Sequence, residues 1–195
     1  MTLSVSAPAG GIDVQLHPSR AAMGRAAAAV VAAKLRRLLQ DGGSARMIFA
    51  AAPSQAEMLD ALVAEPGIDW GRVTAFHMDE YIGLAPDAPA RFALWLRRHL
   101  FDRLPFGAVH LIDPGHDPAG AAAAYARGLA EAPIDIVCLG IGVNGHLAFN
   151  DPPVADLSDP LDVKVVELDA VCRQQQVDDG CFPRLAGVPT HAITL

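Results

Sequence analysis

Apolar runs of strand length alternate along the chain with segments of helical length, and this alternation constrains the fold most strongly. Met47–Ala51 and Ile134–Leu139 are continuous apolar runs, which is typical of strands buried on both faces of a sheet. Further strands are predicted at Ile12–Leu16, Arg72–Met78, Val109–Ile112, Leu161–Leu168 and His191–Leu195, and helices at Pro18–Gln40, Ser54–Ala64, Arg91–Leu104 and Pro118–Ala130. Because strands separated by helices form parallel βαβ units, the sequence predicts an α/β fold with a mostly parallel sheet and helices on both faces.

The length of the chain suits one domain. At 195 residues, folding buries roughly 70% of the surface that the unfolded chain exposes. We therefore expect a single domain over residues 1–195. The last predicted strand, His191–Leu195, ends the sequence without a covering helix, although a buried parallel strand needs one. We expect a domain that lacks its C-terminal elements, and a natural edge strand is the alternative.

Charge and composition exclude several classes of partner. The 15 Lys and Arg against 22 Asp and Glu give a net charge of −7, which argues against binding to nucleic acid or to an anionic membrane. An anionic small ligand stays open, because backbone dipoles bind phosphate even in an acidic protein. No signal-peptide pattern begins the chain, and its longest apolar stretch, Ala26–Ala33, is too short to span a bilayer. With three cysteines and no CxxC motif, these features predict a cytoplasmic protein.

The stretch Phe76–Leu84 places two carboxylates directly after a predicted strand. Ligands of open α/β sheets bind beyond the carboxyl ends of strands. Asp79 and Glu80 lie there among apolar neighbours, where the pKa of a carboxyl group rises and the group acts as a base near neutral pH. The alternative is that one of them only caps a turn.

A second stretch, Gly140–Pro152, follows the most apolar strand and contains a literal GxGxxG. We do not interpret it as a dinucleotide site, because no helix fits before Leu161 and prolines interrupt the crossover. Gly142 and Gly145 are instead expected to let backbone N–H groups approach an anionic or sugar ligand. His146 is the candidate proton shuttle, with Asn144, Asn150 and Asp151 close enough in sequence to orient its ring. A structural hydrogen bond is the alternative role for this histidine.

The third stretch, Ala50–Glu57, runs from a strand directly into a helix. Free N–H groups and the helix dipole at such a point favour an anion such as phosphate. Ser54 and Glu57 also fit a capping box, which would satisfy the same N–H groups internally. The sequence leaves these two readings open. No HxxxH, HExxH or paired Cys/His motif occurs, so neither a metal nor another cofactor is expected.

Two of these stretches together resemble the glucosamine-6-phosphate deaminase/isomerase family. FHMDEYIGL, at Phe76–Leu84, is similar to that family's F-x-M-D-E-Y-x-G-L, and GIGVNGHLAFNDP, at Gly140–Pro152, is similar to its G-x-G-x-[DN]-G-H-x-A-F-N-E-P. The resemblance covers about residues 10–195. It implies a Rossmann-like three-layer sandwich and the conversion of glucosamine 6-phosphate to fructose 6-phosphate and ammonia, without a cofactor. The related 6-phosphogluconolactonases share the GHxA portion but not the MDEYxGL block.

The resemblance also implies roles for individual residues. Asp79 would move a proton from C2 to C1 of the sugar, and His146 would assist ring opening, oriented by Asn144 and Asp151. Substrate contacts would come from Ala52, Ser54, Gln55, Glu80, Gly142 and Gly145. The family has Glu where this chain has Asp151, so the shorter side chain puts its contact with His146 at risk. The stretch Arg173–Asp178 has no arginine at the position that we align with the family's phosphate-contacting one, and the family's phosphate-binding lysine lies beyond Leu195.

Two other functions remain as alternatives at this point. One is a hydrolase of a sugar-phosphate lactone, like the 6-phosphogluconolactonases. The other is a non-catalytic domain that senses a sugar phosphate, although the chain carries no helix-turn-helix or basic segment and a sensor has no need for a base and a proton shuttle. In each reading the partner is a small-molecule sugar phosphate, and a homo-oligomer is compatible with all of them.

Overall fold

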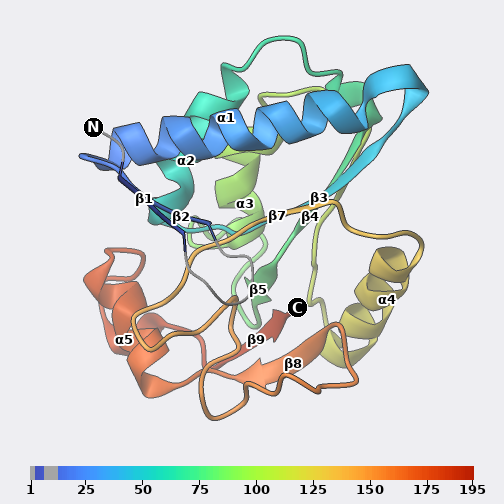
Figure 1. Cartoon of the computed structure of the whole chain (residues 1–195). Coiled ribbons are helices and arrows are strands. Elements are labelled where there is room, and N and C mark those ends of the chain that lie inside the picture. The colour runs from blue at the N-terminus through green and yellow to red at the C-terminus, as the bar shows by residue number, and fades with distance from the viewer. Residues whose placement is uncertain (1–2, 7–12) are drawn as a thin grey trace.

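A parallel four-stranded sheet forms the centre of the molecule. We describe it from a computed structural model that places residues 3–6 and 13–195 (Figure 1). The strands are β6 (Ala108–His110), β4 (Val73–His77), β3 (Ala45–Phe49) and β7 (Ile136–Cys138), in that order across the sheet. The predicted parallel α/β sheet is confirmed for these four strands.

Helices cover both faces of this sheet, as the sequence predicts (Figure 1). One layer contains α1 (Arg20–Leu38), α2 (Ala56–Val63) and α3 (Phe92–Leu96), which continues as a π-helical segment over Arg97–Phe101. The other contains α4 (Pro118–Ala130). Strand β3 shows why both layers are needed: Phe49 packs with Leu35 and Leu59 of the first layer, whereas the adjacent Ile48 packs with Tyr125 of α4. Alternate side chains of a strand point to opposite faces, so each layer has its own core.

The later strands do not extend the parallel sheet: the predicted strands Leu161–Leu168 and His191–Leu195 belong to a second sheet. A separate antiparallel sheet contains β5 (Asp79–Tyr81), β9 (His191–Thr194) and β8 (Lys164–Glu167), in that order. Its β5 follows β4 after the single residue Met78, whose N–H donates to Phe49 and whose carbonyl accepts from Leu195. Met78 therefore joins the two sheets, and Asp79 lies directly at this junction.

Three smaller elements also differ from the sequence-based expectation. Strand β2 (Asp13–Leu16) pairs antiparallel with β1 (Leu3–Ser6) instead of joining the central sheet, and the predicted starting residue Ile12 lies outside the described residues. A 3₁₀ turn, Pro53–Gln55, precedes α2. The sequence analysis missed helix α5 (Ala170–Asp178), which begins where the Asp169 carboxylate accepts a hydrogen bond from the Val171 N–H.

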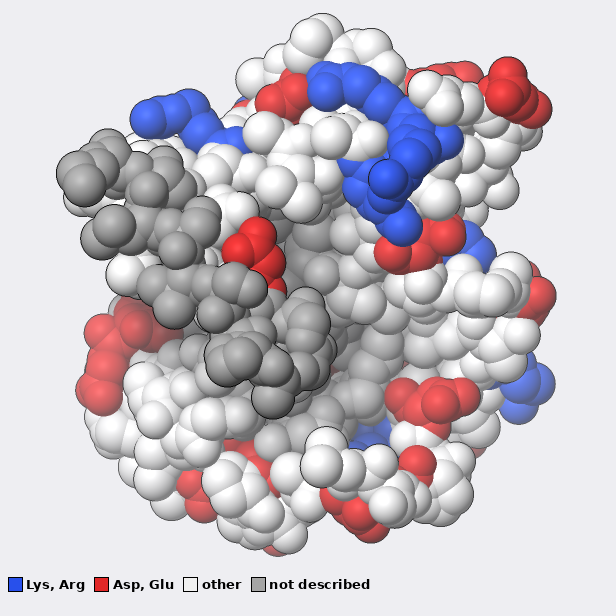
Figure 2. Space-filling model, viewed as in Figure 1, with Lys and Arg blue, Asp and Glu red and all other residues white. Residues whose placement is uncertain are grey.

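The charged side chains are mixed on the visible face of the molecule. In Figure 2, Lys and Arg gather toward the top, over α1, whose last turn contains Arg36 and Arg37, while Asp and Glu are spread over the whole visible face. Within the described residues, none of the helices combines the length and apolar character needed to cross a lipid bilayer.

Candidate active site

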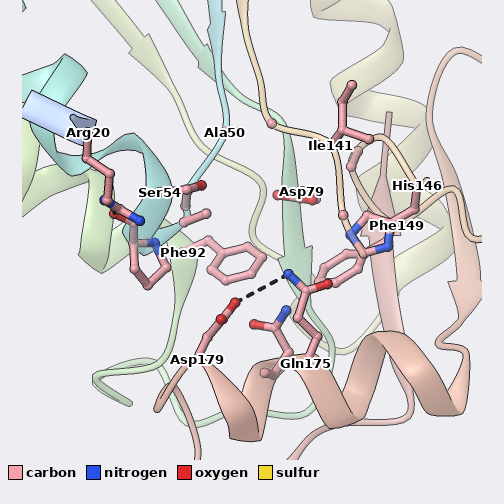
Figure 3. A pocket seen from close by; sticks show the side chains of 17 residues that line it. Arg20, Ala50, Ser54, Asp79, Phe92, Ile141, His146, Phe149, Gln175 and Asp179 are labelled. Atoms are coloured by element: carbon pink, nitrogen blue, oxygen red, sulfur yellow. Dashed lines mark hydrogen bonds between the residues drawn. The ribbon is translucent and has the colours of Figure 1, made fainter. Parts of the chain in front are cut away.

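A pocket of about 250 Å³ opens beyond the carboxyl ends of β3, β4 and β7 (Figure 3). This is the edge at which open α/β sheets bind their ligands. Its lining comes from residues 50–54 after β3, Asp79, residues 140–142 with His146, Ala148 and Phe149, and also from Arg20, Phe92, Gln175, Gln176 and Asp179. The structure thus brings Asp79 and His146, which are 67 positions apart in the sequence, into one pocket.

Asp79 contributes a carboxyl group with a raised pKa. The residue is only 6% exposed, and burial, together with the charge of Glu80, raises the pKa of Asp79 to about 8. Strand pairing holds the backbone in place, with Asp79 opposite Thr194 in the antiparallel sheet. The group is therefore an acid at neutral pH and becomes a base as it ionises.

Glu80 does not line the pocket, contrary to its predicted substrate contact. Its side chain is fully buried, and its carboxylate accepts hydrogen bonds from the N–H groups of Phe92 (3.1 Å) and Ala93 (3.0 Å) at the start of α3. Arg91 lies 3.4 Å from the same carboxylate. Glu80 therefore fixes the start of α3, and through it the ring of Phe92, which does line the pocket.

The ring of His146 is held by two oxygen acceptors on one side. Its Nδ1 lies 2.7 Å from Oδ1 of Asn144 and 3.0 Å from Oδ1 of Asp151. The Asn144 amide is oriented in turn, because its Nδ2 donates to Asp151 at 2.9 Å. With two acceptors around it, Nδ1 is the ring nitrogen suited to carry a proton, which leaves Nε2 as the nitrogen that can accept a proton in the pocket.

Asp151 keeps the contact that its shorter side chain put at risk. The residue is completely buried and lies 3.0 Å from Nδ1 of His146, and its carboxylate accepts hydrogen bonds from the Asn144 amide and from the Asp169 N–H at 3.2 Å. Neither Asp151 nor Asn144 lines the pocket itself. Both act on His146 from behind, as the resemblance implies, and the aspartate reaches as far as the geometry requires.

The glycines of the 140–145 loop serve the histidine more than the ligand. A Cβ on Gly142 would lie 2.1 Å from Cε1 of the His146 ring, so the absence of a side chain makes room for the imidazole. The Gly142 N–H, expected to approach a ligand, donates instead to the His146 carbonyl. Gly145 has a φ of +86° and lies outside the pocket, so its backbone freedom serves the turn.

At the strand-to-helix turn, Ala52 and Ser54 line the pocket, but Gln55 does not. Gln55 is buried, with its amide beside Gly140. The capping-box alternative is wrong, because neither the 3₁₀ turn nor α2 has a side-chain cap. Glu57 accepts two hydrogen bonds from Arg20 instead, at 2.8 and 2.9 Å, and these lower the pKa of Glu57 to about 2.

Several lining residues were missed by the sequence analysis. Arg20 reaches the pocket from α1, where no motif marks it. Helix α5 adds Gln175, which accepts from the Val143 N–H at 3.2 Å and donates to Asp179 at 3.3 Å (Figure 3). The nearby Arg173 is used elsewhere, because it donates to the carbonyls of residues 185, 188 and 189. The polar run before Asp179 was the available signal, but only folding shows which of its side chains face the pocket.

Strand β9 and the following Leu195 contact both the loop that carries His146 and the strand that carries Asp79, although neither β9 nor Leu195 lines the pocket. The Phe149 N–H donates to Oγ1 of Thr194 at 3.0 Å, and the Asn150 amide donates to the Leu195 carbonyl at 2.6 Å. Thr194 is also the strand partner of Asp79. The loop that carries His146 and the strand that carries Asp79 are therefore attached to the same segment.

A polar pocket beyond the carboxyl ends of parallel strands defines an α/β protein of the kind that binds small molecules. Residues 18–157 match the model of the family described as glucosamine-6-phosphate isomerases/6-phosphogluconolactonase. The chain belongs to this family.

Its relatives include a glucosamine-6-phosphate deaminase of an Exiguobacterium species, 37% identical over 132 residues, which cover 67% of this chain and 50% of that protein. One from Listeria innocua is 35% identical over 78% of this chain and 64% of its own. The chain spans about half the length of the first of these relatives.

Solved structures confirm the fold. A monomeric glucosamine-6-phosphate deaminase superposes with a TM-score of 0.80 at 22% identity, covering 91% of this chain and 73% of its own. A 6-phosphogluconolactonase from Shewanella baltica gives a TM-score of 0.69 at 18% identity, covering 92% and 72%. Both subdivisions of the family thus share this architecture.

Proposed function

We propose that this domain, over residues 1–195, converts glucosamine 6-phosphate to fructose 6-phosphate and ammonia in the cytoplasm. The observation that carries the proposal is that a carboxyl group with a raised pKa, Asp79, and an imidazole with a free Nε2, His146, line one pocket of sugar size. Isomerisation needs a carboxylate beside C2, and ring opening needs a proton shuttle beside the ring oxygen. The names of the relatives at 35–37% identity support the same reaction.

In the proposed mechanism, Nε2 of His146 takes the proton of the C1 hydroxyl and returns it to the ring oxygen as the C1–O5 bond breaks. The ionised Asp79 then removes the C2 proton while O1 of the aldehyde takes a proton from the C2 ammonium group, giving an enolamine. Asp79 delivers the C2 proton to C1, which leaves a protonated imine at C2. Water adds to the resulting C2 imine, and ammonia leaves. Asn144 and Asp151 keep the proton on Nδ1, so that Nε2 starts each cycle as the acceptor.

We propose that the substrate phosphate binds at the turn containing Ala52 and Ser54, next to Arg20. Gly142 would contact the opposite side of the sugar. Arg20 is already paired with Glu57 and also donates to the Pro53 carbonyl at 3.0 Å. It therefore reaches the substrate with its charge partly neutralised. Binding energy at the phosphate would hold C2 in position for Asp79.

A second candidate, hydrolysis of a 6-phosphogluconolactone, is favoured by one observation: Nε2 of His146 is equally able to activate water. Asp79→Asn separates the two functions. For the deaminase we expect ammonia release to be lost while glucosamine 6-phosphate still binds. Lactone hydrolysis that survives in this variant, with no ammonia release by the unaltered protein, would favour the lactonase. If both sugar phosphates bind and neither is turned over, the remaining function is that of a non-catalytic domain that senses a sugar phosphate.

A further inference from the structure

Three side chains with different donor atoms lie close together at His146, on the side of its ring where Asp151 lies. They are the His146 imidazole, the Asp151 carboxylate and the thiol of Cys172 on α5, and one ligand atom from each lies within 4.8 Å of the others. Asp151 and Cys172 are completely buried. Cys172 has no part in the mechanism proposed above, so the proximity of its thiol to the imidazole and carboxylate calls for a separate explanation.

The donor set suits a thiophilic divalent cation. Zinc binds imidazole nitrogen and carboxylate oxygen at about 2.0–2.2 Å and thiolate sulfur at about 2.3 Å, and three protein ligands leave one tetrahedral position open. The nitrogen and oxygen are already close, since Nδ1 of His146 and Oδ1 of Asp151 are 3.0 Å apart. Small side-chain shifts would bring the three donors around one ion.

We propose that His146, Asp151 and Cys172 form a binding site for zinc or a similar thiophilic cation, and that the bound ion inhibits the chemistry of the pocket. The first part stands on the cluster alone. The second part rests on the proposed function.

Proton balance gives the physical reason for inhibition. A cysteine binds a metal ion as the thiolate, so binding of the ion releases the Cys172 thiol proton to solvent. Coordination through Nδ1 moves the ring proton of the neutral imidazole to Nε2. The nitrogen that faces the pocket then changes from an acceptor to a donor, and His146 no longer takes the proton of the C1 hydroxyl.

The sequence hides this site because its ligands fit no short metal motif: 4 residues separate His146 from Asp151, and 20 separate Asp151 from Cys172. Of the three ligands, only His146 lines the pocket, so the pocket is the route by which an ion enters. A large sugar phosphate in the pocket should therefore slow metal entry.

Cobalt(II) tests the binding without any enzymatic activity. We expect one Co²⁺ per chain and a near-ultraviolet absorption band from thiolate-to-cobalt charge transfer, which Zn²⁺ abolishes by displacement. The band should be absent in Cys172→Ser and unchanged in Cys181→Ser, whose thiol is half-buried on the segment after α5. Thermal melting confirms that both variants fold. No band, or a band that survives Cys172→Ser or disappears in Cys181→Ser, would overturn the site.

Inhibition is measured separately, as ammonia release against Zn²⁺ concentration. The zinc concentration for half-inhibition should rise at least tenfold in Cys172→Ser, relative to the residual activity of that variant, and stay unchanged in Cys181→Ser. Cobalt binding without zinc inhibition would refute the inhibitory role alone. If no sugar phosphate is turned over, the deaminase proposal fails while the cobalt band still decides whether the site exists.

Discussion

Oδ1 of Asp151 lies 3.0 Å from Nδ1 of His146 and accepts a hydrogen bond from the Asn144 amide at 2.9 Å. A single buried oxygen thus orients both the imidazole and the amide beside it. The proposed proton shuttle depends on this arrangement, because it determines which ring nitrogen carries the proton.

Asp151→Asn should lower kcat by about 100-fold or more, because the amide N–H can donate to Nδ1 and place the ring proton on Nε2. Asp151→Glu is the matched control. It keeps the carboxylate and has the side chain that the family motif carries, so it should retain most activity. Steady-state ammonia release, with melting curves for both variants, makes the comparison. Equal activity of the Asn and Glu variants would show that the tautomer does not matter.

The pH dependence of kcat/KM should follow Asp79. With a pKa of about 8, this carboxyl is mostly protonated at lower pH and cannot remove the C2 proton. We therefore expect kcat/KM for ammonia release to rise with pH, by close to tenfold per unit well below the pKa, and to level off above about pH 8. A profile that is flat between about pH 6 and 8 would exclude a base with this pKa.

The contribution of Asp79 to the free energy of unfolding should change with pH in the opposite direction to the activity. The folded-state pKa of Asp79 is raised from 3.8 to about 8, so the folded protein binds the extra proton between these values. Its contribution to the free energy of unfolding is present below about pH 4 and is lost as pH rises through about 8.

Asp79→Asn removes this dependence. Other buried groups titrate too: burial lowers the pKa of His77 to about 3, which favours the folded state as pH rises. The informative quantity is therefore the difference between variant and unaltered protein. Denaturant unfolding at about pH 5 and pH 8 should show Asp79→Asn gaining stability relative to the unaltered protein at the higher pH. A constant difference would contradict the raised pKa.

Gly142→Ala should displace the His146 ring. The new Cβ would lie 2.1 Å from Cε1, so the imidazole must move, and we expect activity to fall by about 100-fold. Overpacking of this kind costs about 1–3 kcal/mol in the free energy of unfolding. Gly128→Ala in α4 is the control, because no atom of residues 3–6 and 13–195 lies within 4 Å of its added Cβ and helix propensity favours alanine by about 1 kcal/mol. Normal turnover by Gly142→Ala would mean that the ring position is not critical.

The central layers could be predicted because their signals are local. Pro118–Ala130 matches α4 at both ends, since Asp117 and Pro118 mark its start and an apolar, alanine-rich run follows. The buried strands β3 and β4 are apolar runs within one or two residues of the predicted ranges. Asp79 and His146 follow such strands, so sequence position alone placed them at one edge of the sheet.

The features that could not be predicted from the sequence depend on contacts between segments that are distant along the chain. Strand β5 has only three residues, too few for a period, and it exists because β9 pairs with it. Helix α5 has a polar stretch at 173–176 with no apolar stripe, so its helical and pocket-facing character was not visible. The pairing of Glu57 with Arg20, across 37 residues, likewise overrode a plausible local capping box.

The attachment of both sides of the pocket to β9 has a consequence for how activity varies among related sequences. Replacing Thr194 removes the hydroxyl that accepts a hydrogen bond from the Phe149 N–H, and the same substitution changes the strand residue opposite Asp79. None of the residues that line the pocket is itself replaced. Two homologues with identical pocket linings can therefore differ in turnover because their carboxyl and imidazole groups are spaced differently, and inspection of the lining alone would not reveal the cause.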